Sequence, residues 1–157
     1  MDKTAVFKAV METFRATLAD HEKAAGAARE GASGDEVAQE GKYDTRATES
    51  SYLARGHAMQ YEAMLDDLRT LEAYRVPPYD ADEEIGTGAL VEVKTGRAVT
   101  HYFILPAGGG TEATVEDTEV VVINARSPIS KELKGKCAGS SFAIPGKKSK
   151  GKIIAVC

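Results

Sequence analysis

The sequence predicts an α+β protein: an N-terminal antiparallel helical hairpin over residues 1–76, then a small antiparallel β-sheet domain with one short helix over 85–157. Three observations support this fold class. In the first part, apolar residues recur at alternating spacings of four and three, which is typical of a coiled-coil seam. Pro77 and Pro78 then end the helical pattern, because proline lacks the amide donor that a helix needs. After a linker, 77–84, apolar residues alternate with polar ones, which favours strands.

The first helix is predicted over 4–29 and the return helix over 46–75. The first seam contains Phe7, Met11, Phe14, Leu18, His21, Ala25 and Ala28, and the second contains Ser50, Ala54, His57, Tyr61, Met64, Leu68 and Leu71. Both seams have large residues at the base and small ones at the tip, so an antiparallel pair would match them by size. His21 and His57 would then lie near the same level. We interpret them as polar seam residues, with a functional histidine pair as the alternative.

The segment between the helices, 30–49, is the predicted tip of the hairpin and is rich in carboxylates. Its acidic residues are Glu30, Asp35, Glu36, Glu40, Asp44 and Glu49, against the basic residues Lys42 and Arg46. Four small residues, Gly31, Ser33, Gly34 and Gly41, are expected to break the helix here. The segment is either a solvated acidic loop or an arm that meets a cation.

The second half reads as short strands separated by turns. Strands are predicted at 89–93, 99–105, 119–124, 141–144 and 152–156, and the third is apolar enough to be central in a sheet. Ser127 and Pro128 suit the N-cap and first position of a short helix, which Gly135 ends. No nucleophile–base pair, phosphate-binding loop or metal cluster is recognisable in this half. The glycines at 108–110 are interpreted as a flexible turn.

Composition restricts the class of protein. The chain has 157 residues and a net charge of −4, which argues against a general nucleic-acid coat. Its charge is uneven: residues 77–125 carry nine acidic and two basic side chains, whereas from residue 126 onward there are eight basic and one acidic. Such asymmetry bears on partners rather than on fold.

No apolar run approaches the ~20 residues that span a bilayer, and the N-terminus lacks the apolar core of a signal peptide. The two cysteines, Cys137 and Cys157, form neither a metal-ligand cluster nor a disulfide framework. We therefore expect a reduced, cytoplasmic protein, and a monomer.

The segment 121–136, VVINARSPISKELKGK, resembles a pattern of the bacterial Gre transcript-cleavage factors: a strand, then Ser-Pro-Ile, a short helix and Leu-x-Gly-Lys. YLAR at 52–55 and the helix after it resemble the return helix of that family. The order of a helical hairpin followed by a sheet agrees as well. The likeness is strongest over 118–136 and weakest before residue 46. One departure is Arg126, where the family commonly has Asn or Asp.

The resemblance implies an accessory transcription elongation factor rather than an enzyme. The globular domain would have an FKBP-like fold without isomerase activity and would bind RNA polymerase near its secondary channel. Ser127, Pro128 and Ile129 would contribute to docking. The hairpin would enter the channel and contact nascent RNA only indirectly. It would have no cofactor of its own, but its tip acids would help hold Mg²⁺ in the polymerase active site, so that backtracked RNA is hydrolysed.

By this resemblance the acting carboxylates, and joint ligands of that Mg²⁺, are Asp44 and Glu49. Asp35, Glu36 and Glu40 are reserve candidates. The family places its two acids seven and four residues before a tyrosine, and with Tyr52 as that tyrosine these positions hold Thr45 and Thr48. The alternative is therefore a non-cleaving regulator that occupies the channel.

Two further alternatives remain. One is an unrelated adaptor with the same architecture. The other is a peptidyl-prolyl isomerase, for which the domain offers an aromatic lining of only Tyr102, Phe103 and Phe142.

Overall fold

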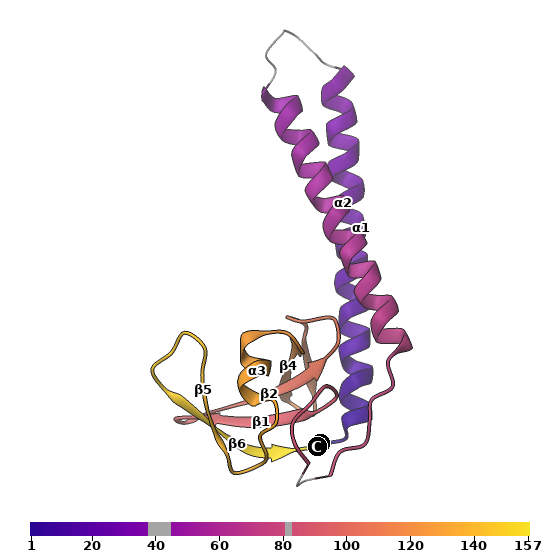
Figure 1. Cartoon of the computed structure of the whole chain (residues 1–157). Coiled ribbons are helices and arrows are strands. Elements are labelled where there is room, and N and C mark those ends of the chain that lie inside the picture. Colours follow the sequence, from indigo (N-terminus) through magenta and orange to yellow (C-terminus); the bar gives the residue numbers. More distant parts are fainter. Residues whose placement is uncertain (38–44, 81–82) are drawn as a thin grey trace. The chain divides into compact units, whose positions relative to one another are not determined.

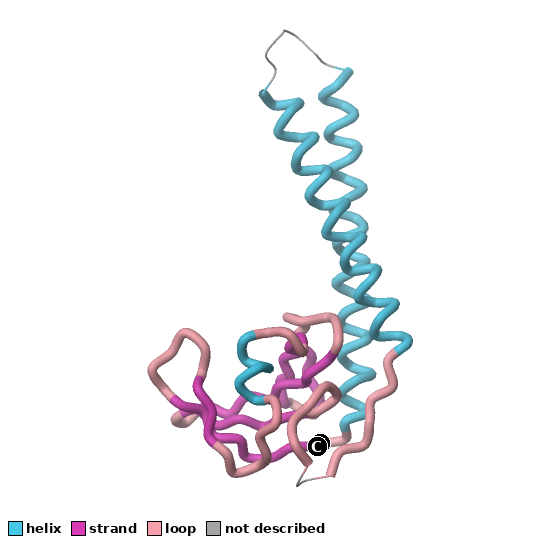
Figure 2. The backbone as a smooth tube through the Cα atoms, viewed as in Figure 1, coloured by secondary structure: helices cyan, strands magenta, loops and turns pink. Residues whose placement is uncertain are grey.

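The computed structural model describes residues 1–37, 45–80 and 83–157 and confirms the α+β fold class: two long helices precede a six-stranded sheet with one short helix (Figures 1 and 2). The chain forms two compact units. Unit 1 comprises Met1–Phe14 and Leu68–Cys157, and unit 2 comprises Arg15–Asp67. The ends of both long helices thus belong to the same unit as the sheet. Whether Pro77 marks a boundary between independently folding domains stays a prediction.

The long helices are α1, Lys3–Val37, and α2, Thr45–Ala73. The predicted helix break after residue 29 is wrong, because α1 continues through Gly31 and Ser33 to Val37. A glycine in a helix costs only about 1 kcal/mol relative to alanine, which a long helix tolerates. The Ser33 hydroxyl donates to the Arg29 carbonyl at 3.0 Å, so this side chain is satisfied without leaving the helix.

The predicted seams are buried only in part, since the seam residues Phe7, Tyr61, Met64 and Leu68 are half-buried. In unit 1, Val6, Val10, Met11, Phe14 and Leu71 are buried. In unit 2, Leu18 and Ala25 are buried, and His21 and His57 are half-buried. Val6 and Val10 lie outside the predicted seam, so the base of α1 buries more than one stripe of side chains.

The sheet has the strand order β3-β4-β2-β1-β6-β5. Its strands are β1 Leu90–Thr95, β2 Ala98–Leu105, β3 Glu112–Val115, β4 Thr118–Asn124, β5 Ser141–Ala143 and β6 Lys150–Val156. All neighbouring pairs are antiparallel except β2 and β4, which are parallel. The sheet is therefore mixed rather than purely antiparallel. The third predicted strand, β4, is central as expected.

Strand β3 is absent from the sequence-based prediction, and it explains the parallel pair. After β2 the chain moves to the edge of the sheet, forms β3, and returns as β4 between β3 and β2. The hairpin turn is Glu116-Asp117, with φ values of 49° and 62°. Hairpin turns of this kind usually contain Asn-Gly or Asp-Gly, so the sequence gives no turn motif here.

One face of the sheet packs against α3, Pro128–Leu133. This core contains Ile85, Ala89, Val91, Val93, Ile104, Ile123, Leu133, Phe142, Ile153 and Val156, all buried. Ile85 also exchanges backbone hydrogen bonds with the segment after α3: its N–H donates to the Lys136 carbonyl at 2.9 Å, and its carbonyl accepts from the Gly135 N–H at 2.9 Å. These bonds fix α3 and the residues before β1 beside each other.

Candidate functional site

The connection from β4 to α3 is a corner fixed by a serine cap. Ser127 has extended backbone angles, φ −64° and ψ 154°, and Pro128 occupies the first turn of α3. The Ser130 N–H donates to the Ser127 hydroxyl at 3.2 Å. An N-cap hydroxyl that accepts from the third helical residue satisfies a donor that the helix itself leaves free. The predicted start of the helix is confirmed.

A second serine completes the corner. The Ser127 hydroxyl donates to the Ser130 hydroxyl at 3.0 Å, which in turn donates to the Asn124 carbonyl at 2.8 Å. Ser130 is 2% exposed and is the one buried polar residue among those described. The sequence predicted no role for Ser130, although it occupies the position three residues after the cap that completes a capping box in other helices.

The three predicted docking residues differ in exposure. Pro128 is exposed, whereas Ser127 and Ile129 are half-buried. Ile129 packs against the core under α3. Both hydrogen-bonding functions of the Ser127 hydroxyl are used inside the corner, so Pro128 is the member best placed to contact a partner. The docking role itself stays a prediction.

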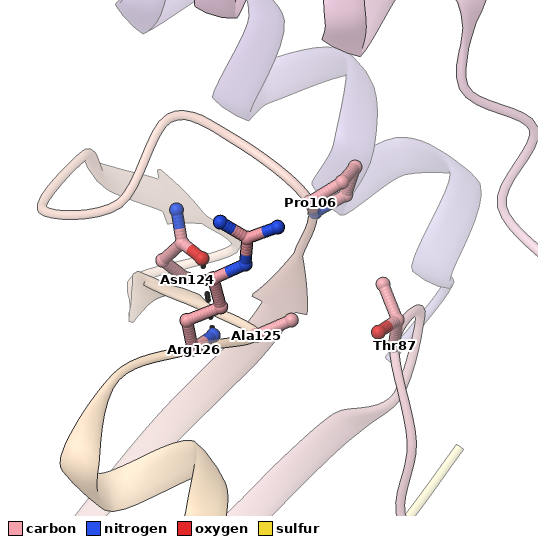
Figure 3. Close-up of a pocket in the computed structure, with 5 residues that line it drawn as sticks. All are labelled: Thr87, Pro106, Asn124, Ala125 and Arg126. Carbon is pink, nitrogen blue, oxygen red and sulfur yellow. Dashed lines mark hydrogen bonds between the residues drawn. The ribbon is translucent and has the colours of Figure 1, made fainter.

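A cavity of about 330 Å³ lies beside this corner, lined by Thr87, Pro106, Asn124, Ala125 and Arg126. Figure 3 shows Asn124, Ala125 and Arg126 along one side and Thr87 across from them. The Arg126 N–H donates to the Asn124 side-chain oxygen at 3.1 Å, which orients that amide. The Arg126 side chain is exposed.

A smaller cavity, about 50 Å³, shares Thr87 and Ala125 and adds Ser130 and Lys134. Neither set of lining residues contains an acidic side chain, and together they supply the charges of Arg126 and Lys134. A guanidinium binds a carboxylate through two parallel hydrogen bonds. The cavities can therefore accept an anionic group next to Pro128. Sequence reasoning identified the corner but not its opposite wall, since Thr87 and Pro106 are distant in sequence.

Most of the predicted tip carboxylates lie outside what the structure describes. This applies to Asp44 and Glu40 entirely, and to the side chains of Asp35 and Glu36, whose backbone belongs to the last turn of α1. Glu49 is exposed on α2. Among the residues that are described, no group of three or more His, Cys, Asp or Glu side chains could hold a metal ion. The Mg²⁺-ligand role of Asp44 and Glu49 stays a prediction.

The start of α2 bears on the spacing of the tip acids. Thr45 is the first residue of the helix, and Thr48 and Glu49 follow within its first turns. Consecutive helical residues are rotated by about 100°, so Glu49 points in a different direction from Thr48. A carboxylate at residue 49 therefore cannot replace one at residue 48 without a change in the helix.

Among the described residues, no helix has the length and apolarity required to cross a membrane.

No protein-family model matches the chain. No curated protein matches it either. Among solved structures, it is similar to the GreA factor homolog 1 (Gfh1) protein of Thermus thermophilus, with 23% identity over 96% of each chain and a TM-score of 0.37. Thermus aquaticus Gfh1 shares 18% identity, over 95% of this chain and 94% of that one, with a TM-score of 0.36.

A further structure, described as the transcription factor Gfh1, is 21% identical over 95% of this chain and 94% of that one, with a TM-score of 0.38. These neighbours are GreA-like factors by name.

Proposed function

We propose that this chain is a Gre-like transcription factor that binds RNA polymerase at its secondary channel and stimulates the cleavage of backtracked RNA. The observation that carries the proposal is the segment 121–136, whose sequence resembles the Gre pattern. It forms the strand, Ser-Pro corner and short helix that this resemblance implies. The helix ends at Leu133 before Gly135, which has a φ of +74°.

The docking surface in this proposal is the corner of Pro128 together with the cavity lined by Arg126. An acidic side chain of the polymerase would enter the cavity and pair with the guanidinium, while Pro128 contacts the surrounding surface. Arg126 stands where the Gre factors commonly have Asn or Asp. The partner surface should therefore offer a carboxylate at this point, since arginine favours a negatively charged partner whereas Asn or Asp does not.

The acting groups in this proposal are Asp44 and Glu49. Mg²⁺ is usually held by one or two protein carboxylates together with phosphate and water, so a tip that supplies two carboxylates can complete a site that the polymerase begins. A second metal in such a site stabilises the attacking and leaving oxygens. The factor then needs no complete active site of its own.

A second candidate function is occupancy of the channel without cleavage. The helical start of α2 favours it, because Thr45 and Thr48 hold the positions where Gre factors carry their acids. Glu49 lies one residue further along a regular helix, which rotates its side chain by about 100°. A factor of this kind would block the channel and inhibit RNA synthesis.

Purified backtracked elongation complexes separate the two functions. If the tip acids act on Mg²⁺, adding the protein releases short 3′ RNA fragments, and Asp44→Asn/Glu49→Gln abolishes this release while polymerase binding survives. Such a variant loses an interaction made chiefly in the transition state, so rate falls far more than affinity. A wild-type protein that inhibits synthesis and releases no fragment would establish the second function.

The reserve acids provide the control for the site assignment. Fragment release that persists in Asp44→Asn/Glu49→Gln would move the role to Asp35, Glu36 or Glu40, each of which can be replaced by its amide in turn. Failure of the wild-type protein to bind polymerase at all would contradict both functions and favour an unrelated adaptor.

Docking is tested separately with Ser127→Asp/Pro128→Ala and with Arg126→Gln. Aspartate is as good an N-cap as serine, so the first variant should stay folded. Both variants are expected to weaken polymerase binding, measured with a labelled factor. Unchanged affinity in both would show that the corner is structural only.

A further inference from the structure

One end of the sheet carries a cluster of positive charge that the proposed function does not use. Lys94 is the second-last residue of β1, and Arg97 lies in the turn to β2. In the register of β1 and β6, Lys94 lies directly opposite Lys152. The loop before β6 therefore lies at the same end as the β1–β2 turn (Figure 1, left side of the sheet). We call this cluster the basic sheet end: Lys94, Arg97, Lys147, Lys148, Lys150 and Lys152.

All six side chains of the basic sheet end are exposed. None forms an ion pair with a carboxylate among the residues that the structure describes. The sequence after Glu132 contains no acidic residue at all. Like charges directly opposite in neighbouring strands are destabilising, and Lys94 and Lys152 form such a pair. The fold thus tolerates repulsion at a place where a bound anion would relieve it.

Acidic side chains at the same end of the sheet belong to its other edge. Glu116 and Asp117 form the β3–β4 turn, and Glu119 is near the start of β4. Strands β2 and β1 lie between β4 and β6, which places these acids roughly 14 Å from Lys152 at the usual strand spacing. The Debye length at physiological ionic strength is about 8 Å, so their charges are largely screened from the lysines.

Glu92 is the nearest acid on β1 itself. Its carboxylate lies 3.8 Å from the His101 imidazole, on the neighbouring strand β2. Glu92 lies two residues before Lys94 on the same face of β1, about 6.7 Å along the strand, so it offsets at most one of the six positive charges of the basic sheet end.

We propose that the basic sheet end binds the phosphate backbone of a nucleic acid without sequence preference. Five of its six side chains are lysines, which are flexible point charges suited to phosphates of variable position. Lys150 and Lys152 point to the same face about 6.7 Å apart along β6. No aromatic side chain belongs to the cluster, so base stacking is not available. Contacts to phosphate position a nucleic acid but carry no sequence information.

An acidic protein surface fits this region less well. Protein interfaces depend on a few buried aromatic or arginine anchors in well-packed pockets. The exposed apolar residues of this end are Val99 and Ile154, and both cavities described above lie around Thr87 and Ala125 instead. The purely structural explanation is that the side chains of the basic sheet end are ordinary solvated surface charges, since none of them lies on the edge strands β3 and β5.

Fluorescence anisotropy with the full-length protein tests the proposal. The probe is a labelled, mixed-sequence single-stranded RNA of 24 nucleotides, titrated at 50, 100 and 200 mM NaCl. Four phosphates neutralised on a single strand give a log–log salt slope of about −2.8, which is roughly a fifty-fold loss of affinity between 50 and 200 mM. Lys150→Gln/Lys152→Gln removes two of these contacts and should reduce the slope by about 1.4.

The matched control is Lys8→Gln/Lys23→Gln, which removes the same charge from exposed positions on α1. It should bind the RNA with the wild-type slope. Equal losses of RNA affinity in the two double variants would overturn the proposal, because binding would then reflect net charge alone. Failure to bind the RNA at 50 mM NaCl would overturn it too, and so would binding that does not weaken as the salt concentration rises. Competition by poly-glutamate as effective as that by unlabelled RNA, at equal charge, would assign the surface to acidic proteins.

Discussion

At the scale of single residues, Ser127 does most to define the candidate docking corner. Its hydroxyl accepts from the Ser130 N–H and donates to the Ser130 hydroxyl. Ser127→Ala removes the cap and leaves a donor of α3 unsatisfied, so we expect the free energy of unfolding to fall by about 1 kcal/mol. Urea unfolding measures the change. Ser127→Asp, which keeps a capping oxygen, should lose much less, and equal losses in both variants would contradict the capping role.

Lys3 gives the protein a pH-dependent stability at alkaline pH. Its ammonium group lies 4.5 Å from the centre of the Tyr79 ring, and its nitrogen is buried without a hydrogen-bond partner among the described residues. Burial lowers the pKa of Lys3 below 10.5, and the nearby Cys157 and Glu83 oppose this shift. Between the folded pKa and 10.5 the unfolded chain binds more protons, so the free energy of unfolding should rise with pH in that window.

Two tyrosines set the upper limit of this rise. Burial raises the pKa values of Tyr74 and Tyr79 above 10.0, so above that pH the folded chain binds more protons and stability should fall. We expect stability to increase toward pH 10 in the wild type and to stay flat in Lys3→Met. Urea unfolding between pH 8 and pH 10 measures both. A rise that persists in Lys3→Met would show that another group causes it.

At the scale of elements, the sequence predicts best what is encoded locally. Two helices, five strands and the capped start of α3 follow from periodicity and from Ser127-Pro128. Strand β3 was missed because four residues of pattern Glu-Ala-Thr-Val become a strand only through pairing with β4. The end of α1 was misplaced because glycine weakens a helix without ending it.

The candidate site also combines residues that are neighbours in sequence with residues that only the tertiary fold brings together. Ser127, Pro128 and Arg126 are neighbours in sequence, so the resemblance identifies them together. Thr87 and Pro106 come from two other connections of the sheet, and only the tertiary fold brings them to the cavity. The tip carboxylates are a different case, because the described residues include the side chain of Glu49 but not that of Asp44.

The segment between α2 and β1 depends on a glycine. Gly88 has a φ of +96°, and a β-carbon there would lie 2.6 Å from a ring carbon of Pro77 and 2.7 Å from the Tyr74 hydroxyl. Gly88→Ala therefore combines backbone strain with overpacking, and we expect a loss of about 2–4 kcal/mol in unfolding free energy. The control is Gly96→Ala, with a φ of +61° and no neighbour within 4 Å, which should show the strain alone. Equal losses would mean that the packing around Pro77 contributes nothing.

At the scale of the whole molecule, the base of α1 shares a core with the sheet within unit 1. The Phe7 and Phe103 rings meet edge to face, with centroids 6.3 Å apart, and Phe7 also lies 6.4 Å from Tyr74. Leu71 and Phe14 both approach Gly108, in the connection that follows β2. Residues that precede Pro77 thus pack against the sheet domain that follows it.

This shared core leads to a test of the predicted boundary at Pro77. A fragment of residues 85–157 would lose Phe7 and expose Phe103 and Leu105, which are fully buried in the whole chain. Exposing two such side chains costs roughly 3–6 kcal/mol, a large part of the 5–15 kcal/mol that stabilises a typical domain. We therefore expect the fragment to be unfolded or only marginally stable in urea titrations.

The matched comparison is a chain in which a short Gly-Ser linker replaces residues 15–67 and joins Phe14 to Leu68. Because Phe14 and Leu71 both lie close to Gly108, such a linker can join the two parts of unit 1 without distorting them. This shortened chain should unfold cooperatively, with a free energy of unfolding several kcal/mol above that of 85–157. If the two are equally stable, Phe7 and its neighbours add nothing to the sheet, and Pro77 is the folding boundary that the sequence predicts.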